Sequence, residues 1–133
     1  MTNKSKKILS EISAGELLDK ISILEIKLQK IKNKDSQNEI EKEYKVLKEA
    51  QKTNIEDTDN VRKLFDEIKL INLDLWDIED KIRICEKNKE FGKEFIELSR
   101  NVYLNNDKRA NFKSQINKML GSNIKEIKQY VNY

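Results

Sequence analysis

The residue types that this 133-residue chain lacks exclude several kinds of protein. It contains no histidine, so a serine or cysteine nucleophile would have to use lysine or a carboxylate as its base. It contains no proline and only three glycines, so few tight turns are expected. Charged residues make up 38% of the chain and aromatic residues 7%. This composition indicates long helices and an all-α protein.

The single cysteine and the short apolar runs indicate the cellular location of the protein. Cys85 lies on an apolar helical stripe, which is typical of a small buried thiol. No run approaches the ~20 apolar residues of a membrane span. The basic start MTNKSKKIL is followed by SEISAGE rather than by the apolar region of a signal peptide. We therefore expect a cytoplasmic protein with no membrane insertion.

The net charge of +3 is not concentrated in one basic block, because lysine and glutamate alternate along the chain. Such alternation is typical of solvated helix faces. Arginine, which nucleic-acid-binding proteins favour, occurs at only four positions. The charge pattern therefore gives little support to nucleic acid as a partner.

Apolar spacing predicts one all-α domain, a bundle of about five helices. Ser13 and Glu16 have the S-x-x-E spacing of a capping box, which starts the first helix near Ala14. The expected helices are 14–31, 38–53, 59–87, 91–104 and about 107–120, of which the third is the long central one. The expected divisions are a flexible N-terminal segment (1–12), the bundle (13–121) and a short irregular C-terminal tail (122–133).

The first helix carries apolar residues on more than one side. Leu18, Ile23 and Ile26 lie outside its main apolar stripe, so it must contact protein on several sides. We expect it at the centre of the bundle or in an interface with another chain. Three charged residues stand among these apolar positions: Asp19, Lys20 and Glu25.

Short carboxylates in such positions need donors, and the candidates are Arg83, Arg100 and Arg109. On the long helix, Glu79 and Arg83 can pair at i and i+4 beside Trp76. A polar break at NND predicts that Asn106 or Asp107 caps the last helix. A helix N-terminus with arginine and lysine nearby is typical of a small-anion site.

These residues define a candidate ligand-binding site, in which arginine and lysine would hold an anion and carboxylates would orient the cations. The site comprises Asp19, Lys20, Glu25, Trp76, Glu79, Arg83, Arg100, Tyr103, Asn106, Asp107, Arg109 and Lys113. The alternative is a closed salt-bridge network of the same residues, which would fix helix register without binding a ligand.

A second hypothesis is an enzyme. The all-α nucleotide pyrophosphatases hold Mg²⁺ with paired carboxylates on adjacent helices, because a hard cation needs several oxygen ligands. The pairs with suitable i, i+3 spacing are Glu16 with Asp19 and Asp77 with Asp80. Such pairs also arise by chance in a chain this rich in acidic residues, and Glu16 already has a capping role. The first hypothesis needs no metal, cofactor or catalytic residue.

Three segments carry a resemblance that covers most of the chain: GELLDKISILEIK (15–27), NLDLWDIEDKIR (72–83) and FGKEFIELSRNVYLNNDKRANFKSQIN (91–117). They resemble an uncharacterised family of small, mostly bacterial and phage proteins, a domain of unknown function. The chain departs from that family's pattern at Ser99, where alanine is typical, and in its ending EIKQY. Members occur near genes for cell-surface polysaccharides and glycosyltransferases. The resemblance therefore implies an accessory role in envelope sugar chemistry.

From the residues and the resemblance together we expect a non-catalytic helical binding or accessory module. It would form a homo-oligomer or bind a protein partner, and it would recognise a small anionic ligand at the candidate site.

Overall fold

The computed structural model describes residues 6–133, and this part of the chain forms four α-helices and no β-strand. The helices are α1 (Ala14–Lys30), α2 (Lys34–Asn54), α3 (Asp59–Asn88) and α4 (Lys93–Leu120). The all-α class and the long helix expected over 59–87 are confirmed. None of these four helices is long and apolar enough to cross a membrane.

The predicted division of the last helical region into two helices is wrong. α4 continues without interruption through NND, and Asn106 and Asp107 lie inside the helix. Asn105 donates its side-chain amide to the carbonyl oxygen of Asn101 at 2.8 Å, a bond within the helix. Asparagine and aspartate lower helix stability by only about 0.7 kcal/mol per residue relative to alanine. Packing of α4 along α3 outweighs this local preference, so the expected helix N-terminus does not exist.

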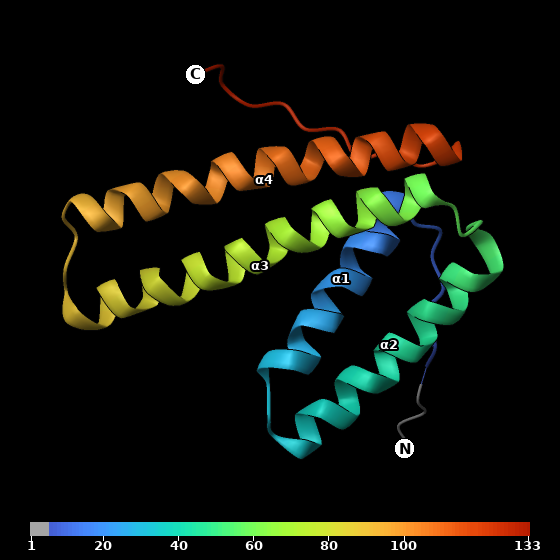
Figure 1. Ribbon diagram of the computed structural model, residues 1–133, viewed down its shortest axis with the longest axis horizontal. Helices are drawn as coiled ribbons and strands as arrows, with labels where there is room; N and C mark the ends of the chain where they lie inside the picture. Colours follow the sequence, from blue (N-terminus) through green and yellow to red (C-terminus); the bar gives the residue numbers. More distant parts are fainter. Residues whose placement is uncertain (1–5) are drawn as a thin grey trace.

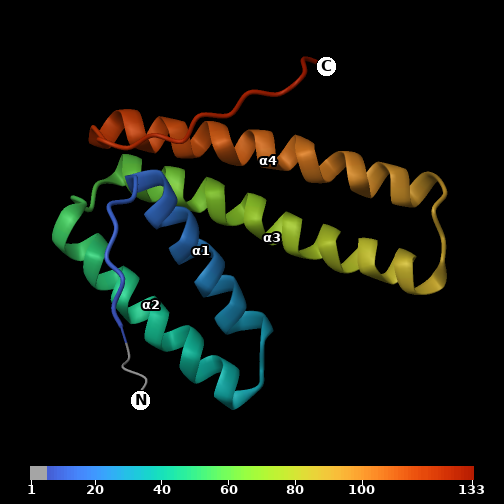
Figure 2. The same cartoon turned by 180° about the vertical axis from the view of Figure 1, so that it is seen from behind.

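The four helices form two antiparallel hairpins (Figure 1). α3 and α4 extend along the whole molecule, and the shorter α1–α2 hairpin packs beside one half of them. The view from behind shows the same arrangement (Figure 2). α1 contacts each of the other helices, whereas α2 has α1 as its one close helix neighbour within residues 6–133. The apolar residues on several sides of α1 are therefore explained by its central position.

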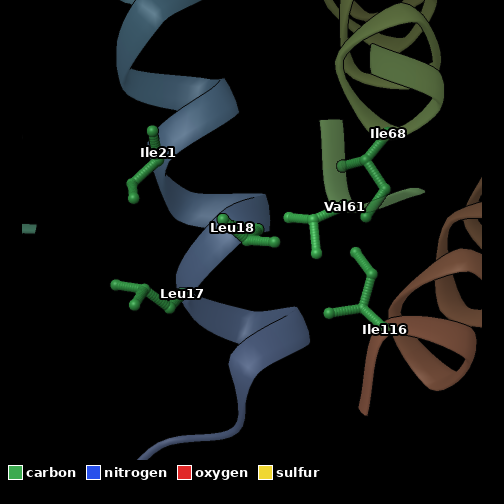
Figure 3. Close-up of a cluster of buried hydrophobic side chains, with 6 residues drawn as sticks. All are labelled: Leu17, Leu18, Ile21, Val61, Ile68 and Ile116. Atoms are coloured by element: carbon green, nitrogen blue, oxygen red, sulfur yellow. The ribbon is translucent and has the colours of Figure 1, made fainter. Parts of the chain in front are cut away.

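The hydrophobic core lies where α1 meets α3 and α4 (Figure 3). Leu18 points from α1 toward Val61 of α3 and Ile116 of α4, whereas Leu17 and Ile21 point away to another side of α1. Leu18, Ile21 and Ile116 are completely buried. Full burial of one such side chain stabilises a fold by about 1.5–3 kcal/mol. Packing on more than one side of α1 thus holds the two hairpins together.

Past α1, the C-terminal half of α3 and the N-terminal half of α4 continue as an arm, and neither α1 nor α2 lies beside its tip (Figure 1). At its tip the rings of Phe91 and Phe95 meet edge to face, with centroids 5.3 Å apart. Cys85 is buried in the arm, as predicted, and burial raises the pKa of its thiol. Ile84 and Ile96 remain 57% and 55% exposed. The arm therefore leaves apolar surface uncovered.

The segments outside the helices are attached to the helical domain at defined points. The tail, residues 122–133, contains no helix, as predicted, and part of it lies along α4 (Figure 1). The Ser122 hydroxyl accepts from the backbone N–H of Ala14 at 2.9 Å, and the Tyr133 hydroxyl donates to Asp107. Residues 1–5 of the segment predicted over 1–12 lie outside the described residues.

Candidate functional site

Asp19 of α1 is the most buried charged residue of the candidate site. Its side chain is 2% exposed, and it accepts from Arg109 Nε at 2.8 Å and Arg109 Nη2 at 2.5 Å. Asn72 Nδ2 of α3 donates to the same carboxylate at 2.9 Å. Of the three arginines proposed as donors for the helix 1 carboxylates, Arg109 is therefore the partner of Asp19.

The surroundings of Asp19 keep it ionised. Burial acts to raise the pKa of Asp19, but hydrogen bonds from Arg109 and Asn72 and the charges of Arg109 and Lys113 outweigh it, so the pKa is lowered. The hydrogen bond with Asp19 in turn raises the pKa of Arg109. This is a bidentate, charge-assisted pair between α1 and α4, the strongest common type of side-chain hydrogen bonding.

The lowered pKa of Asp19 predicts a dependence of stability on pH. An acid whose folded-state pKa lies below its unfolded value contributes stability that is complete above the unfolded pKa and is lost as pH falls through the folded pKa. The usual value is 3.8, so we expect the free energy of unfolding to decrease as pH falls below that value. Urea titrations over a range of acidic pH should show a smaller decrease for Asp19→Asn, and equal slopes for the two proteins would contradict this prediction.

Lys113, one turn after Arg109 on α4, also lies close to Asp19. Its ammonium group is 2.7 Å from Glu16, 3.1 Å from Glu126 and 3.8 Å from Asp19. Burial acts to lower the pKa of Lys113, but its hydrogen bonds to Glu16 and Glu126 outweigh burial and raise it. We call the following residues the Asp19 cluster: Glu16, Asp19, Asn72, Arg109, Lys113 and Glu126.

The Asp19 cluster is closed by its own partners. Two cations face three carboxylates, and Lys113 is only 10% exposed at its side chain. No buried side-chain nitrogen or oxygen lacks a hydrogen-bond partner within residues 6–133. An anion site needs donors that are free to bind the ligand. The geometry therefore favours the closed-network alternative.

α1 and α4 approach each other closely beside this cluster, at Gly15. The backbone N–H of Gly15 donates to Asn117 Oδ1 at 2.7 Å. A Cβ atom at Gly15 would lie 2.6 Å from the carbonyl oxygen of Lys113, which is closer than carbon and oxygen can approach. Only glycine fits here. The approach brings Asp19 within reach of Arg109 and Glu16 within reach of Lys113.

Glu25 does not join the arginines. It accepts from Lys69 Nζ at 2.8 Å and from the Tyr44 hydroxyl at 3.0 Å, which links α1 to α2 and α3. Burial and the bond to Glu25 raise the pKa of Tyr44 to about 12. Lys20, on the same helix, is exposed. The structure therefore separates these two residues of the candidate site from the Asp19 cluster.

The remaining predicted residues lie on α3 and α4. Arg83 donates to Glu79 at 2.5 Å, so the predicted i, i+4 pair is confirmed. Tyr103 packs edge to face on Tyr133 of the tail, with ring centroids 5.3 Å apart. Arg100 is exposed. The twelve candidates thus belong to several separate places rather than to one site.

A groove of about 520 Å³ lies beside the Asp19 cluster at the base of the arm. We call it the arm groove; its lining residues are Ile23, Ile26, Asn72, Leu75, Trp76, Glu79, Asp80, Arg83, Asn106 and Arg109. Five of the predicted site residues are among them. The groove combines apolar side chains of α1 and α3, including the partly buried Trp76, with charged residues of both signs. Mixed surfaces of this kind are typical of protein–protein contacts.

The carboxylates that the enzyme hypothesis assigns to Mg²⁺ do not converge on one point. Glu16 and Asp19 bind Lys113 and Arg109, and Asp77 and Asp80 are exposed on α3. In the part of the chain that the structure describes, no three acidic or thiol side chains are grouped so that they could hold a metal ion.

Sequence reasoning assigned no role to Glu126 of the cluster or to Ser22 beside it. Ser22 accepts from Asn72 Nδ2 at 2.8 Å, and Glu126 reaches Lys113 from the tail. The sequence does place Asn72 on the flank of α3 that carries Trp76, where a polar side chain needs partners, but it does not identify Asp19 and Ser22 as those partners. The tail offers no such signal, because exposed acidic residues occur throughout the chain.

A family model described as a family of unknown function, DUF6165, matches residues 8–133. The chain belongs to this family. The match spans all four helices and the tail, so the Asp19 cluster and the arm lie within it. No curated protein and no solved structure matches the chain.

Proposed function

We propose that this DUF6165 protein is a cytoplasmic, non-catalytic module that self-associates through the arm groove. The observation that carries the proposal is the arm groove, where apolar side chains of α1 and α3 lie beside charged residues of both signs at the base of a two-helix arm. Two helical hairpins commonly cover such surface by packing together as a four-helix bundle. A second copy of the chain is the simplest source of another hairpin.

The charges of the groove suit a twofold contact. Glu79 and Arg83 lie one turn apart on α3, and both line the groove. In a twofold dimer the two α3 helices would run antiparallel, and each contact would occur twice. If the axis crosses this pair of helices at the level of residue 81, midway between Glu79 and Arg83, then Glu79 of one copy lies opposite Arg83 of the other. The Lys81 side chain itself lies on the other side of the helix, two residues from Glu79. The groove is therefore self-complementary in charge.

This proposal gives the Asp19 cluster a supporting role. Arg109 and Lys113 bind buried or partly buried carboxylates of their own chain, which is why we favour a protein contact over a small anion. The cluster fixes where α1 lies against α3 and α4, and so it shapes the groove. Self-association also suits the accessory role in envelope sugar chemistry that the sequence resemblance implies, because an assembly module needs no catalytic residue.

We expect light scattering after gel filtration to give a molar mass of twice the 15.8 kDa chain. Glu79→Arg or Arg83→Glu alone would bring like charges together across the twofold axis, and each should weaken the dimer at least about tenfold. The double variant Glu79→Arg/Arg83→Glu restores opposite charges and should restore the dimer. Sedimentation equilibrium measures all three dissociation constants.

Lys81→Glu is the matched control, because Lys81 is exposed on the side of α3 away from the groove. It should leave the dissociation constant unchanged. A monomeric protein, or single and double variants that dimerise equally well, would overturn self-association through this groove. Circular dichroism of every variant shows whether the helices are intact.

A further inference from the structure

A second cleft, of about 700 Å³, lies between α2 and the start of α3. It exists because α2 packs on α1 and has no other close helix neighbour within residues 6–133. None of the 21 residues of α2 is fully buried. One side of α2 therefore faces the cleft without being covered. We call this space the α2–α3 cleft.

Apolar side chains form part of the α2–α3 cleft. Tyr44 of α2, Ile55 of the following loop and Phe65 of α3 line it, and each is partly buried. Val61 lines it as well and belongs to the hydrophobic core, so the cleft reaches down to the core. An occupant with an apolar face would bury this surface from water, which is the main favourable term in most protein association.

Lysines on α2 also line the cleft. Lys45, Lys48 and Lys52 are exposed and stand at i, i+3 and i+7, so they form a stripe about 10 Å long on one helix face. Within residues 6–133 none of the three forms an ion pair with a carboxylate, whereas Arg62 on the α3 side is 2.9 Å from Asp57. Glu49 lines the same side, so the three lysines and this glutamate give the α2 side of the cleft a net charge of +2.

We propose that the α2–α3 cleft is a docking site for an amphipathic helix of a partner protein, with acidic residues beside its apolar face. A helix placed in a groove contacts it along successive turns, and that matches a stripe of lysines spread over two turns. A small anion would instead need cations that converge on one point. Charge complementarity therefore selects an acidic helix, and this site is independent of the arm groove.

The probe is a fluorescein-labelled peptide of about four helical turns with leucine along one face and glutamate elsewhere. Fluorescence anisotropy measures its binding to the full chain at low and at physiological salt. We expect saturable binding that weakens with salt. Lys45→Glu/Lys52→Glu should weaken binding at least about tenfold.

Lys30→Glu/Lys34→Glu is the matched control, because it changes the charge of the α1–α2 hairpin equally at exposed positions that lie far along the hairpin from the cleft and do not line it. It should change the dissociation constant by less than about twofold, since distant charges are screened. A peptide of the same composition with dispersed leucines should bind weakly.

Several results would overturn the proposal: no binding of the helical peptide, equal losses for the two double variants, or equal binding of the dispersed peptide. Tighter binding of a single-stranded oligonucleotide of similar length would assign the cleft to nucleic acid instead. The Glu79 and Arg83 variants should bind the peptide normally, so failure of the arm-groove dimer and failure of this site are distinguishable.

Discussion

Asp19→Ala is expected to lower the free energy of unfolding by about 3–5 kcal/mol, because it removes one partner of a buried ion pair. In the native protein the Asp19 carboxylate binds Arg109 with two hydrogen bonds and Asn72 with one. Without it, Arg109 keeps only a 3.4 Å contact with Asn106, and the Asn72 amide retains Ser22 as its acceptor. An uncompensated charge in this place is far more costly than the pair itself is stabilising. Urea denaturation followed by circular dichroism measures the loss.

Glu86→Ala provides the comparison for Asp19→Ala. Glu86 binds Lys89 at 3.0 Å, but both side chains are more than half exposed. Exposed pairs contribute about 1 kcal/mol or less, because water and salt screen them. If Asp19→Ala cost no more than Glu86→Ala, the Asp19 cluster would not be holding α1 against α4. The double variant Asp19→Ala/Arg109→Ala should recover part of the loss, since it leaves fewer unpaired charges.

Features that depend on residues close in the sequence could be predicted from it. Ser13 caps α1 by accepting from the N–H of Glu16 at 3.1 Å, and Glu79 pairs with Arg83 one turn away. The periodic apolar stripe predicted α3 within one residue at its C-terminal end. In each case the helix geometry alone decides which residues meet.

Contacts between distant segments could be predicted only as sets of candidates. Asp19 and Arg109 are 90 positions apart, and sequence reasoning reduced the donors to three arginines without choosing among them. The choice depends on how α1 crosses α4. Glu25 shows the same limit: its partner is Lys69, and lysine is so common in this chain that no pattern singles one out.

Local signals also failed where packing opposed them. Two asparagines and an aspartate in succession predict a helix break, yet α4 continues through them, because it packs along α3 and has buried residues both before them, at Leu98, and after them, at Ile116. Glu16 shows a similar conflict. The capping box predicts that its carboxylate reaches back to Ser13, but the carboxylate binds Lys113 of α4 instead, at 2.7 Å. The tertiary pair joins two ionised groups, whereas the local bond would join the carboxylate to a neutral backbone amide.

Gly15→Ala is expected to lower the free energy of unfolding by about 3 kcal/mol, although alanine is the better helix former by about 1 kcal/mol. The added Cβ would lie 2.6 Å from the Lys113 carbonyl oxygen and 2.9 Å from Asn117 Oδ1. The backbone of α4 belongs to a packed helix and cannot yield, so α1 must move outward. That movement would also stretch the 2.7 Å hydrogen bond from Gly15 to Asn117.

Gly92→Ala is the matched substitution, because no atom lies within 4 Å of the Cβ that it would add and its φ of −85° lies outside the left-handed region that favours glycine. It should change the free energy of unfolding by less than about 1 kcal/mol. Thermal or urea denaturation of the two variants shows whether the steric overlap of the added Cβ or the higher helix propensity of alanine dominates at Gly15. If Gly15→Ala were neutral or stabilising, helix propensity would dominate, and α1 and α4 could not be as close in solution as the fold requires. A large loss at Gly15 alone would show that the close approach of these helices, on which the Asp19–Arg109 pair depends, is a condition of the fold.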